Sequence, residues 1–159
     1  MNDQVIKKFV ASAIQVLSTE LGVGARVDQP SAQGDYYVSK GVTALIGVTG
    51  RLRGMVIFGL NEETALKLVS HMMGSEFEKL DEVAQSGVAE MANVVVGSFV
   101  TSLAELGFSC GITPPAVMIG KDTVISTPNI KRLVIPLQVP IGNIEIQLAL
   151  RDNRVNYSS

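Results

Sequence analysis

A carboxylate and an amide stand out within an otherwise apolar stretch of this sequence. The segment SGVAEMANVVVGSF, residues 86–99, is rich in small and aliphatic side chains, yet it carries Glu90 and Asn93, with Ser86 one helical turn earlier. A carboxylate pairs with cations, and an amide both donates and accepts hydrogen bonds. Such a polar set points either to a surface that binds a partner or to the ordinary polar face of an amphipathic helix.

On a helix, the candidate residues fall in one narrow stripe. A helix advances about 100° per residue, so relative to Ser86 the side chain of Glu90 lies at about 40°, Asn93 at about −20° and Gly97 at about 20°. Small residues flank this stripe and leave a flat face that another protein can approach closely. The larger apolar residues gather on the opposite side, which we expect to face the core: Val88, Met91, Ala92, Val95, Val96 and Phe99.

Both interpretations of the polar stripe remain open at this point. Every amphipathic helix needs a polar face, and a Glu and an Asn at this spacing will often arise without a function. Asparagine is nevertheless a mediocre helix former, and lysine or glutamate would serve better inside a helix. A local conflict of this kind favours a functional role for Asn93.

The composition fits one folded domain and excludes several kinds of partner. Of the 159 residues, 47% are hydrophobic and 18% are charged, and the net charge is −2. No basic block is present, so we expect no nucleic-acid partner. The single Cys110 and the single His71 give no disulfide and suggest no zinc site. We identify no signal peptide and no apolar run long enough for a membrane span, and therefore expect a cytoplasmic protein without a membrane partner.

Hydrophobic periodicity predicts three helices. The first covers residues 3–21, with Gly22 as the expected stop. The second covers 61–74, beginning with Asn61 as N-cap and ending at Gly74, and the third runs from about 80 to 106 and is closed by Gly107. Strand-like segments separated by Gly and Pro fill the remainder: 23–29, 35–39, 42–49, 53–60, 108–113, 116–119, 123–127, 131–139 and 143–150, with a tight turn at Gly142-Asn143.

An internal repeat divides the chain into two related halves. The segments ELGVGARVDQP (20–30) and ELGFSCGITPP (105–115) align without gaps at an offset of 85 residues, and GMVIFGL (54–60) matches GNIEIQL (142–148). We therefore predict an α+β fold in which two pseudo-symmetric halves, each a long helix followed by antiparallel strands, form one sheet packed by the long helices. The domain should span residues 1–150 and leave a polar tail at 151–159.

The polar stripe and its flanks resemble a known family. The segment DEVAQSGVAEMANVVVGSFVTSL is similar to the signature helix of the CheC/CheX/FliY chemotaxis phosphatases, in which an Asp or Ser, a Glu and an Asn stand at the spacing of Ser86, Glu90 and Asn93. The preceding TGRLRGMVIFGLNEETALKLVSHMMG and the following ELGFSCGITPPAVMIG also resemble the family. The resemblance covers most of residues 1–150.

The repeat narrows the resemblance to one branch of the family. At the offset of 85, Glu90 corresponds to Val5 and Asn93 to Lys8, so the first helix carries no second Glu-x-x-Asn. CheC-like members have the motif in both halves, whereas a single motif in the second half of a stand-alone chain resembles CheX. Since CheX-type proteins are dimers whose sheets join through edge strands, the resemblance implies a homodimer.

The resemblance also implies a reaction, which is hydrolysis of the aspartyl phosphate on a CheY-like response regulator. Asn93 would position the attacking water, and Glu90 would pair with the regulator's active-site lysine. Ser86 would make a supporting contact, and Gly97 would belong to the partner-binding face. No metal or cofactor is expected on this chain, because the regulator brings its own Mg²⁺. The alternative is a non-catalytic module on the same fold, which binds the regulator or serves as a flagellar-switch-type scaffold.

Other residues that could do chemistry are better explained by structural roles. His71 could act as a general base, although interaction with the last carbonyls of its helix is favoured. Cys110 is expected to be a small buried side chain rather than a nucleophile. Met72, Met73 and Met91 could form a soft interface, but core packing is the default.

Overall fold

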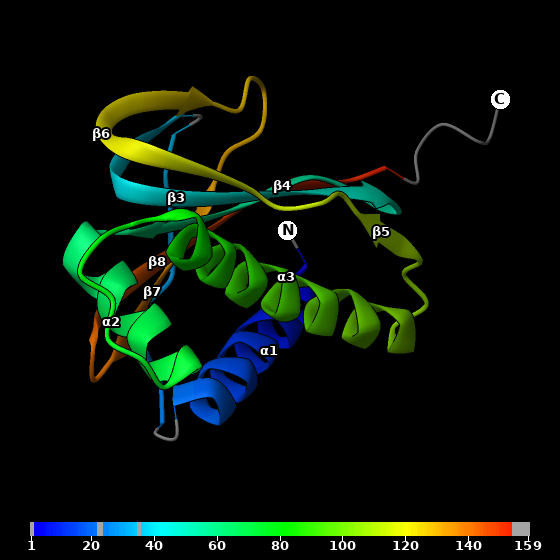
Figure 1. The fold of residues 1–159 in the computed structure, drawn as a ribbon. Coiled ribbons are helices and arrows are strands. Elements are labelled where there is room, and N and C mark those ends of the chain that lie inside the picture. Colours follow the sequence, from blue (N-terminus) through cyan, green and yellow to red (C-terminus); the bar gives the residue numbers. More distant parts are fainter. Residues whose placement is uncertain (1, 22–23, 35, 154–159) are drawn as a thin grey trace, which may run out of the picture.

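An antiparallel sheet with helices against one face forms the frame of the protein (Figure 1). The structure is a computed structural model that describes residues 2–21, 24–34 and 36–153. The helices are α1 (Asp3–Leu21), α2 (Glu62–Met73) and α3 (Glu82–Glu105). The strands are β1 (Arg26–Val27), β2 (Ser31–Ala32), β3 (Tyr36–Gly50), β4 (Leu52–Leu60), β5 (Cys110–Ile112), β6 (Ala116–Ser126), β7 (Leu133–Val139) and β8 (Gly142–Asp152).

The strand order is symmetric about the centre of the sheet, as the sequence repeat predicts. The order is β1-β7-β8-β4-β3-β5, with β2 also paired to β7 and β6 to β3. The fifth residues of the two matching segments, Phe58 and Ile146, pair directly across β4 and β8. A twofold axis at the centre of the sheet requires this pairing. The predicted α+β fold of two pseudo-symmetric halves is confirmed.

Two pairs of predicted strands are each one continuous strand in the structure. Segments 35–39 and 42–49 join in β3, whose register with β6 shifts between Val38 and Lys40. Segments 116–119 and 123–127 join in β6, which passes through Asp122 at φ 63°. A bulge or a single left-handed residue bends a strand without ending it, although in a sequence it looks like a turn.

The connection between β7 and β8 also differs from the prediction. The turn lies at residues 140–141 rather than at Gly142-Asn143, because Gly142 already pairs with Val139. Gly142 has φ 143°, and a Cβ at this position would overlap the Thr64 hydroxyl of α2. This glycine therefore allows α2 to pack closely against the start of β8.

Near both ends of the chain, the strands begin and end at other residues than predicted. The predicted strand 23–29 contains only the short β1, and β2 follows it. Gly22, the expected end of the first helix, and residue 35 lie outside the described residues. At the other end, β8 continues to Asp152, so the first two residues of the predicted tail pair with β4. Residues 154–159 lie outside the described part of the chain.

Local capping groups set the predicted ends of α2 and α3. The Asn61 side chain accepts a hydrogen bond of 2.8 Å from the Thr64 amide, and Gly74 ends α2 in the left-handed conformation at φ 66°. Beyond α3, Gly107 has φ 83°, and the Phe108 amide donates to the Leu103 carbonyl across the helix end. These contacts satisfy terminal backbone groups and hold both helix ends in place.

The core lies between the sheet and the three helices. The rings of Phe9 from α1 and Phe99 from α3 meet edge to face with centroids 5.0 Å apart, and both side chains are fully buried. By length and composition α3 could cross a membrane. Nine of its residues are nevertheless buried inside the domain, so α3 is accounted for as a core helix.

The other face of the sheet carries a buried polar cluster around Tyr37, Arg132 and Gln147. Tyr37 packs its phenol ring against Gly59, where a Cβ would overlap the hydroxyl. Arg132 is 7% exposed and donates to the carbonyl of Gly34 and to the side chain of Gln147. These contacts tie the first residues of β3 and the segment before β7 to the central strands.

Candidate active site

The polar stripe lies on the surface of α3. Ser86 and Glu90 are exposed and Asn93 and Gly97 are partly exposed. The side expected to face the core is buried as predicted, with exposed fractions of 0–1% for all six residues: Val88, Met91, Ala92, Val95, Val96 and Phe99. Because one helix carries the whole set, the spacing of its Cα positions is fixed before any partner binds.

The three polar side chains of the stripe have no partner within the described part of the molecule. Neither hydrogen bonds nor ion pairs to other described residues occupy Ser86, Glu90 or Asn93. By contrast, Gln85 on the same helix donates to the Leu80 carbonyl at 2.8 Å. The polar groups of the stripe are therefore available to an external partner.

The two glycines of α3 have different structural explanations. A Cβ on Gly87 would lie 3.1 Å from both methyl groups of Val69 and 3.3 Å from Met73 Cε, so this glycine lets α2 approach α3. A Cβ on Gly97 would meet nothing within 4 Å. Internal packing thus accounts for Gly87 but not for Gly97. Because Gly97 has no side chain, the helix surface next to Asn93 is flat.

The first half of the repeat uses the equivalent positions for structure. Val5, the counterpart of Glu90, is fully buried in the core. Lys8, the counterpart of Asn93, forms an ion pair of 2.8 Å with Glu105 and so links α1 to the end of α3. The structure therefore places one exposed Glu-Asn set on the described residues, on α3 alone.

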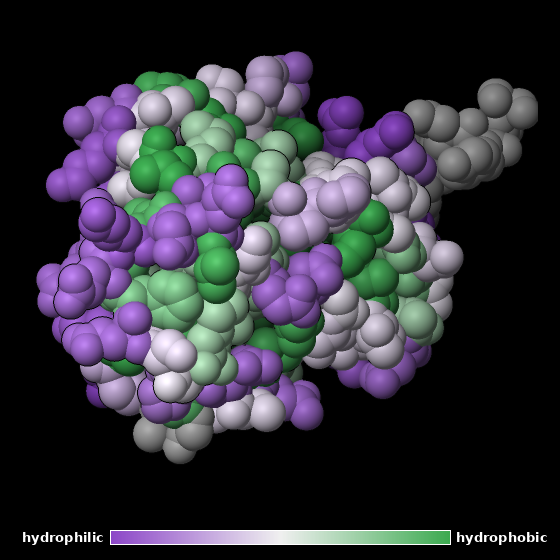
Figure 2. All heavy atoms as spheres, viewed as in Figure 1, coloured by the Kyte–Doolittle hydropathy of each residue, from purple (hydrophilic) through white to green (hydrophobic). Residues whose placement is uncertain are grey.

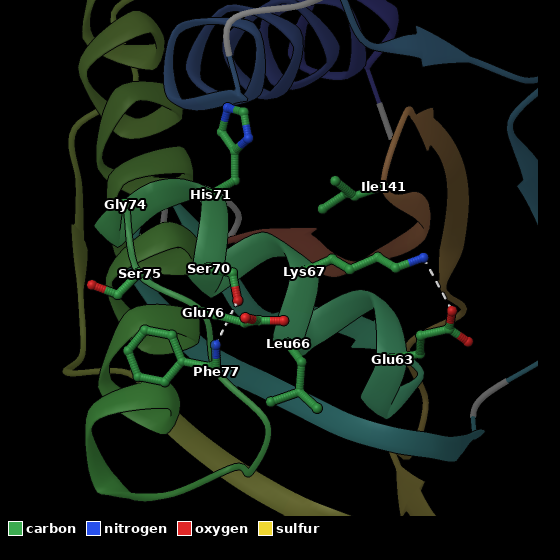
Figure 3. Close-up of a pocket in the computed structure, with 10 residues that line it drawn as sticks. All are labelled: Glu63, Leu66, Lys67, Ser70, His71, Gly74, Ser75, Glu76, Phe77 and Ile141. Atoms are coloured by element: carbon green, nitrogen blue, oxygen red, sulfur yellow. Dashed lines mark hydrogen bonds and ion pairs between the residues drawn. The ribbon is translucent and has the colours of Figure 1, made fainter.

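The open groove beside α2 lies apart from the polar stripe. It has a volume of about 560 Å³ and lies between α2, the segment 74–77 and Ile141, with none of the stripe residues in its lining. His71 is exposed in the last turn of α2, and Figure 3 shows its ring directed toward α1. The preference for a carbonyl contact at His71 stays a prediction.

Cys110 and two of the three candidate methionines pack within the fold, whereas the third methionine does not. Cys110 is half-buried rather than fully buried, and its Sγ accepts a hydrogen bond of 3.4 Å from the Leu52 amide. Met91 is part of the hydrophobic core, and the partly buried Met72 packs against this core. Met73 is 43% exposed, so core packing does not explain it.

An apolar border lies beside the polar stripe, and of its residues only Met73 was considered from the sequence, as a possible soft interface for which core packing was the default. Met73, Val83 and Val94 are exposed beside the stripe, and Figure 2 shows green apolar surface next to purple hydrophilic surface over the helices on this side of the molecule. The same projection of about 100° per residue places Val83 and Val94 close to Glu90 on the helix. That projection was the signal available in the sequence, whereas Met73 required the packing of α2.

The fold and this face together define an α+β protein that carries a carboxylate and an amide on the solvent-facing side of one core helix. The family model described as chemotaxis phosphatase CheX matches residues 42–138. The CheY-P phosphatase CheX of Thermotoga maritima is 32% identical over 143 residues, which cover 89% of each chain. This chain therefore belongs to the CheX family.

Solved structures agree with this assignment. A chain of the CheX–CheY–BeF₃–Mg²⁺ complex from Borrelia burgdorferi is 32% identical and superposes with a TM-score of 0.79 over 92% of this chain and 97% of that one. The chemotaxis protein CheX from Desulfovibrio desulfuricans, at 24% identity, superposes with a TM-score of 0.84 over 93% and 99% of the two chains and supports the fold.

Proposed function

We propose that this protein is a phosphatase that hydrolyses the aspartyl phosphate of a CheY-like response regulator in chemotaxis signalling. The observation that carries the proposal is the pair of exposed Glu90 and partly exposed Asn93 on α3, neither of which has a partner among the described residues, in a chain of the CheX family. The relative from Thermotoga maritima is a CheY-P phosphatase, and the Borrelia burgdorferi complex joins CheX to CheY.

Asn93 is suited to positioning the attacking water. An aspartyl phosphate is already reactive, so the phosphatase has to hold a water in line with phosphorus rather than supply a nucleophile. The amide oxygen of Asn93 accepts a hydrogen bond from this water, while its NH₂ group donates toward the phosphoryl oxygens. A carboxylate in the same place would bring negative charge against the anionic phosphoryl group.

Glu90 is suited to fixing the position of the regulator. It lies three residues before Asn93, about 4.5 Å along the helix axis. A salt bridge from Glu90 to the regulator's active-site lysine would set the register in which Asn93 meets the phosphoryl group. Ser86 would add a polar contact one turn earlier. The Mg²⁺ ion belongs to the regulator, and no cofactor is needed on this chain.

The proposed function includes a homodimeric assembly and a cytoplasmic location. Within the described part of the chain, β6 pairs with β3 alone, which leaves one edge of β6 open. The exposed apolar residues of these two strands support an edge-strand homodimer: Tyr36, Val38, Ile119 and Val124. Since the regulator acts inside the cell, the protein is expected in the cytoplasm.

The test compares catalysis with binding alone. A CheY-like regulator carrying phosphate is mixed with a tenfold smaller amount of this protein, and the loss of phosphate is followed against the regulator alone. Several turnovers per molecule are expected. If the protein binds the phosphorylated regulator but leaves its rate of phosphate loss unchanged, the alternative of a non-catalytic binding or flagellar-switch-type scaffold module replaces the proposal.

A further inference from the structure

Three exposed apolar side chains border the polar stripe of α3. Seven large hydrophobic side chains are exposed among the described residues, and four of them lie on β3 and β6. The other three are Met73, Val83 and Val94, with exposed fractions of 43%, 53% and 36%. These three residues are named the apolar flank.

The apolar flank lies on the α2 side of the stripe, next to Glu90. Relative to Ser86, Val83 projects at about 60° and Val94 at about 80°, whereas Glu90 projects at about 40°. Met73 extends from α2 to the same side, because its Cε lies 3.3 Å from the position that a Cβ on Gly87 would occupy. Asn93, at about −20°, lies at the opposite border of the stripe.

Helix stability does not explain the two exposed valines. A β-branched side chain loses rotamer freedom in a helix, and lysine or glutamine would be more favourable at a solvent-facing position. Burial does not explain them either, since both side chains remain exposed in the folded chain. Exposed apolar side chains that gather beside a polar site are typical of a protein-binding surface.

The size of a protein interface connects the apolar flank to the partner of the stripe. A stable interface takes about 800 Å² from each protein, which is far more than a few polar and small side chains offer. A regulator that reaches Glu90 and Asn93 must therefore cover residues next to them. The flank is continuous with Glu90, so the regulator would cover it in the same docked position.

We propose that the apolar flank determines which regulators this protein accepts, by packing against an apolar surface of the phosphorylated regulator on the lysine side of its phosphoryl group. The inference rests on the proposed function, in which Glu90 pairs with that lysine. Apolar contacts beside the ion pair exclude water and strengthen it. A regulator with charged residues at this position would bind weakly even if its phosphorylation site were unchanged.

The experiment measures affinity and rate separately. The variant Val83→Gln/Val94→Gln places better helix formers at both positions. Val124→Gln makes the same change at an exposed valine on β6 and serves as the control, once size-exclusion chromatography verifies that it keeps the oligomeric state of the wild type. The dissociation constant for a CheY-like regulator loaded with beryllofluoride is measured by titration calorimetry. The single-turnover rate is then measured with the phosphatase at saturating concentration, and circular dichroism verifies that every variant is folded.

The flank variant is expected to raise the dissociation constant at least tenfold, with an unchanged single-turnover rate at saturation, while Val124→Gln retains the wild-type affinity. Val83→Ala and Val94→Ala should each raise the dissociation constant by a smaller factor. If the wild-type protein is active and the flank variant binds the regulator with an affinity within twofold of wild type, the proposed role of the apolar flank is wrong and the proposed function stands. If the wild-type protein neither binds nor dephosphorylates the regulator, the proposed function fails with it.

Discussion

At the scale of single residues, Glu90 and Asn93 can be separated by experiment because one acts through charge and the other through geometry. Replacing Glu90 by Gln keeps the shape of the side chain and removes its charge. Loss of one partner from an ion pair that becomes desolvated costs about 2 kcal/mol or more, which corresponds to a roughly thirtyfold weaker complex. Titration with a beryllofluoride-loaded regulator measures this change, and Glu78→Gln in the exposed segment before α3 is the control. Equal affinities for Glu90→Gln and wild type would contradict the role of the charge.

Tyr37 gives a second prediction at this scale. Burial, the largest cause, raises the pKa of its phenol above the ordinary value, so the unfolded chain ionises first as the pH increases. The stabilising contribution is complete below a pH of about 10 and is lost as the pH rises through the higher folded pKa. The free energy of unfolding should fall between pH 9 and pH 11 by urea denaturation, and it should fall less in Tyr37→Phe. Parallel curves for the two proteins would show that Tyr37 does not contribute.

At the scale of elements, α3 carries two glycines with opposite expected responses to alanine. Gly97→Ala should raise the free energy of unfolding by about 0.5–1 kcal/mol, because alanine favours the helix and the new methyl group meets nothing. Gly87→Ala should lose about 1 kcal/mol against Val69 and Met73. Denaturant unfolding measures both, and a stabilising Gly87→Ala would contradict the packing account. The Gly97 variant should also bind the regulator less tightly, since its methyl group stands on the docking face.

The same scale shows which parts of the structure a sequence can specify. The ends of α2 and α3 were predictable because Asn61, Gly74 and Gly107 act on backbone groups within a few residues of themselves. The continuity of β3 through Gly41 could not be predicted from the sequence, because it depends on pairing with β6, about eighty residues away. The polar stripe required only helical geometry, whereas Met73 joined the site surface through packing between two helices.

At the scale of the whole molecule, the exposed edge of β6 predicts the assembly. Ile119 is 50% exposed on this strand, and a lysine at such a position blocks pairing between edges. Ile119→Lys should convert a homodimer to a monomer, as measured by light scattering coupled to size-exclusion chromatography. Val83→Lys on α3 is the control and should leave the mass unchanged. A monomeric wild-type protein at micromolar concentration would contradict the edge-strand dimer.

The most direct test of the central claim is the single-turnover rate of phosphate loss from a CheY-like regulator saturated with Asn93→Ala. Since Asn93 is proposed to place the attacking water, its loss should slow the reaction by roughly a hundredfold, while the affinity for the beryllofluoride-loaded regulator stays close to wild type. A rate for Asn93→Ala within a factor of two of wild type would contradict the water-positioning role and, with it, the proposed mechanism.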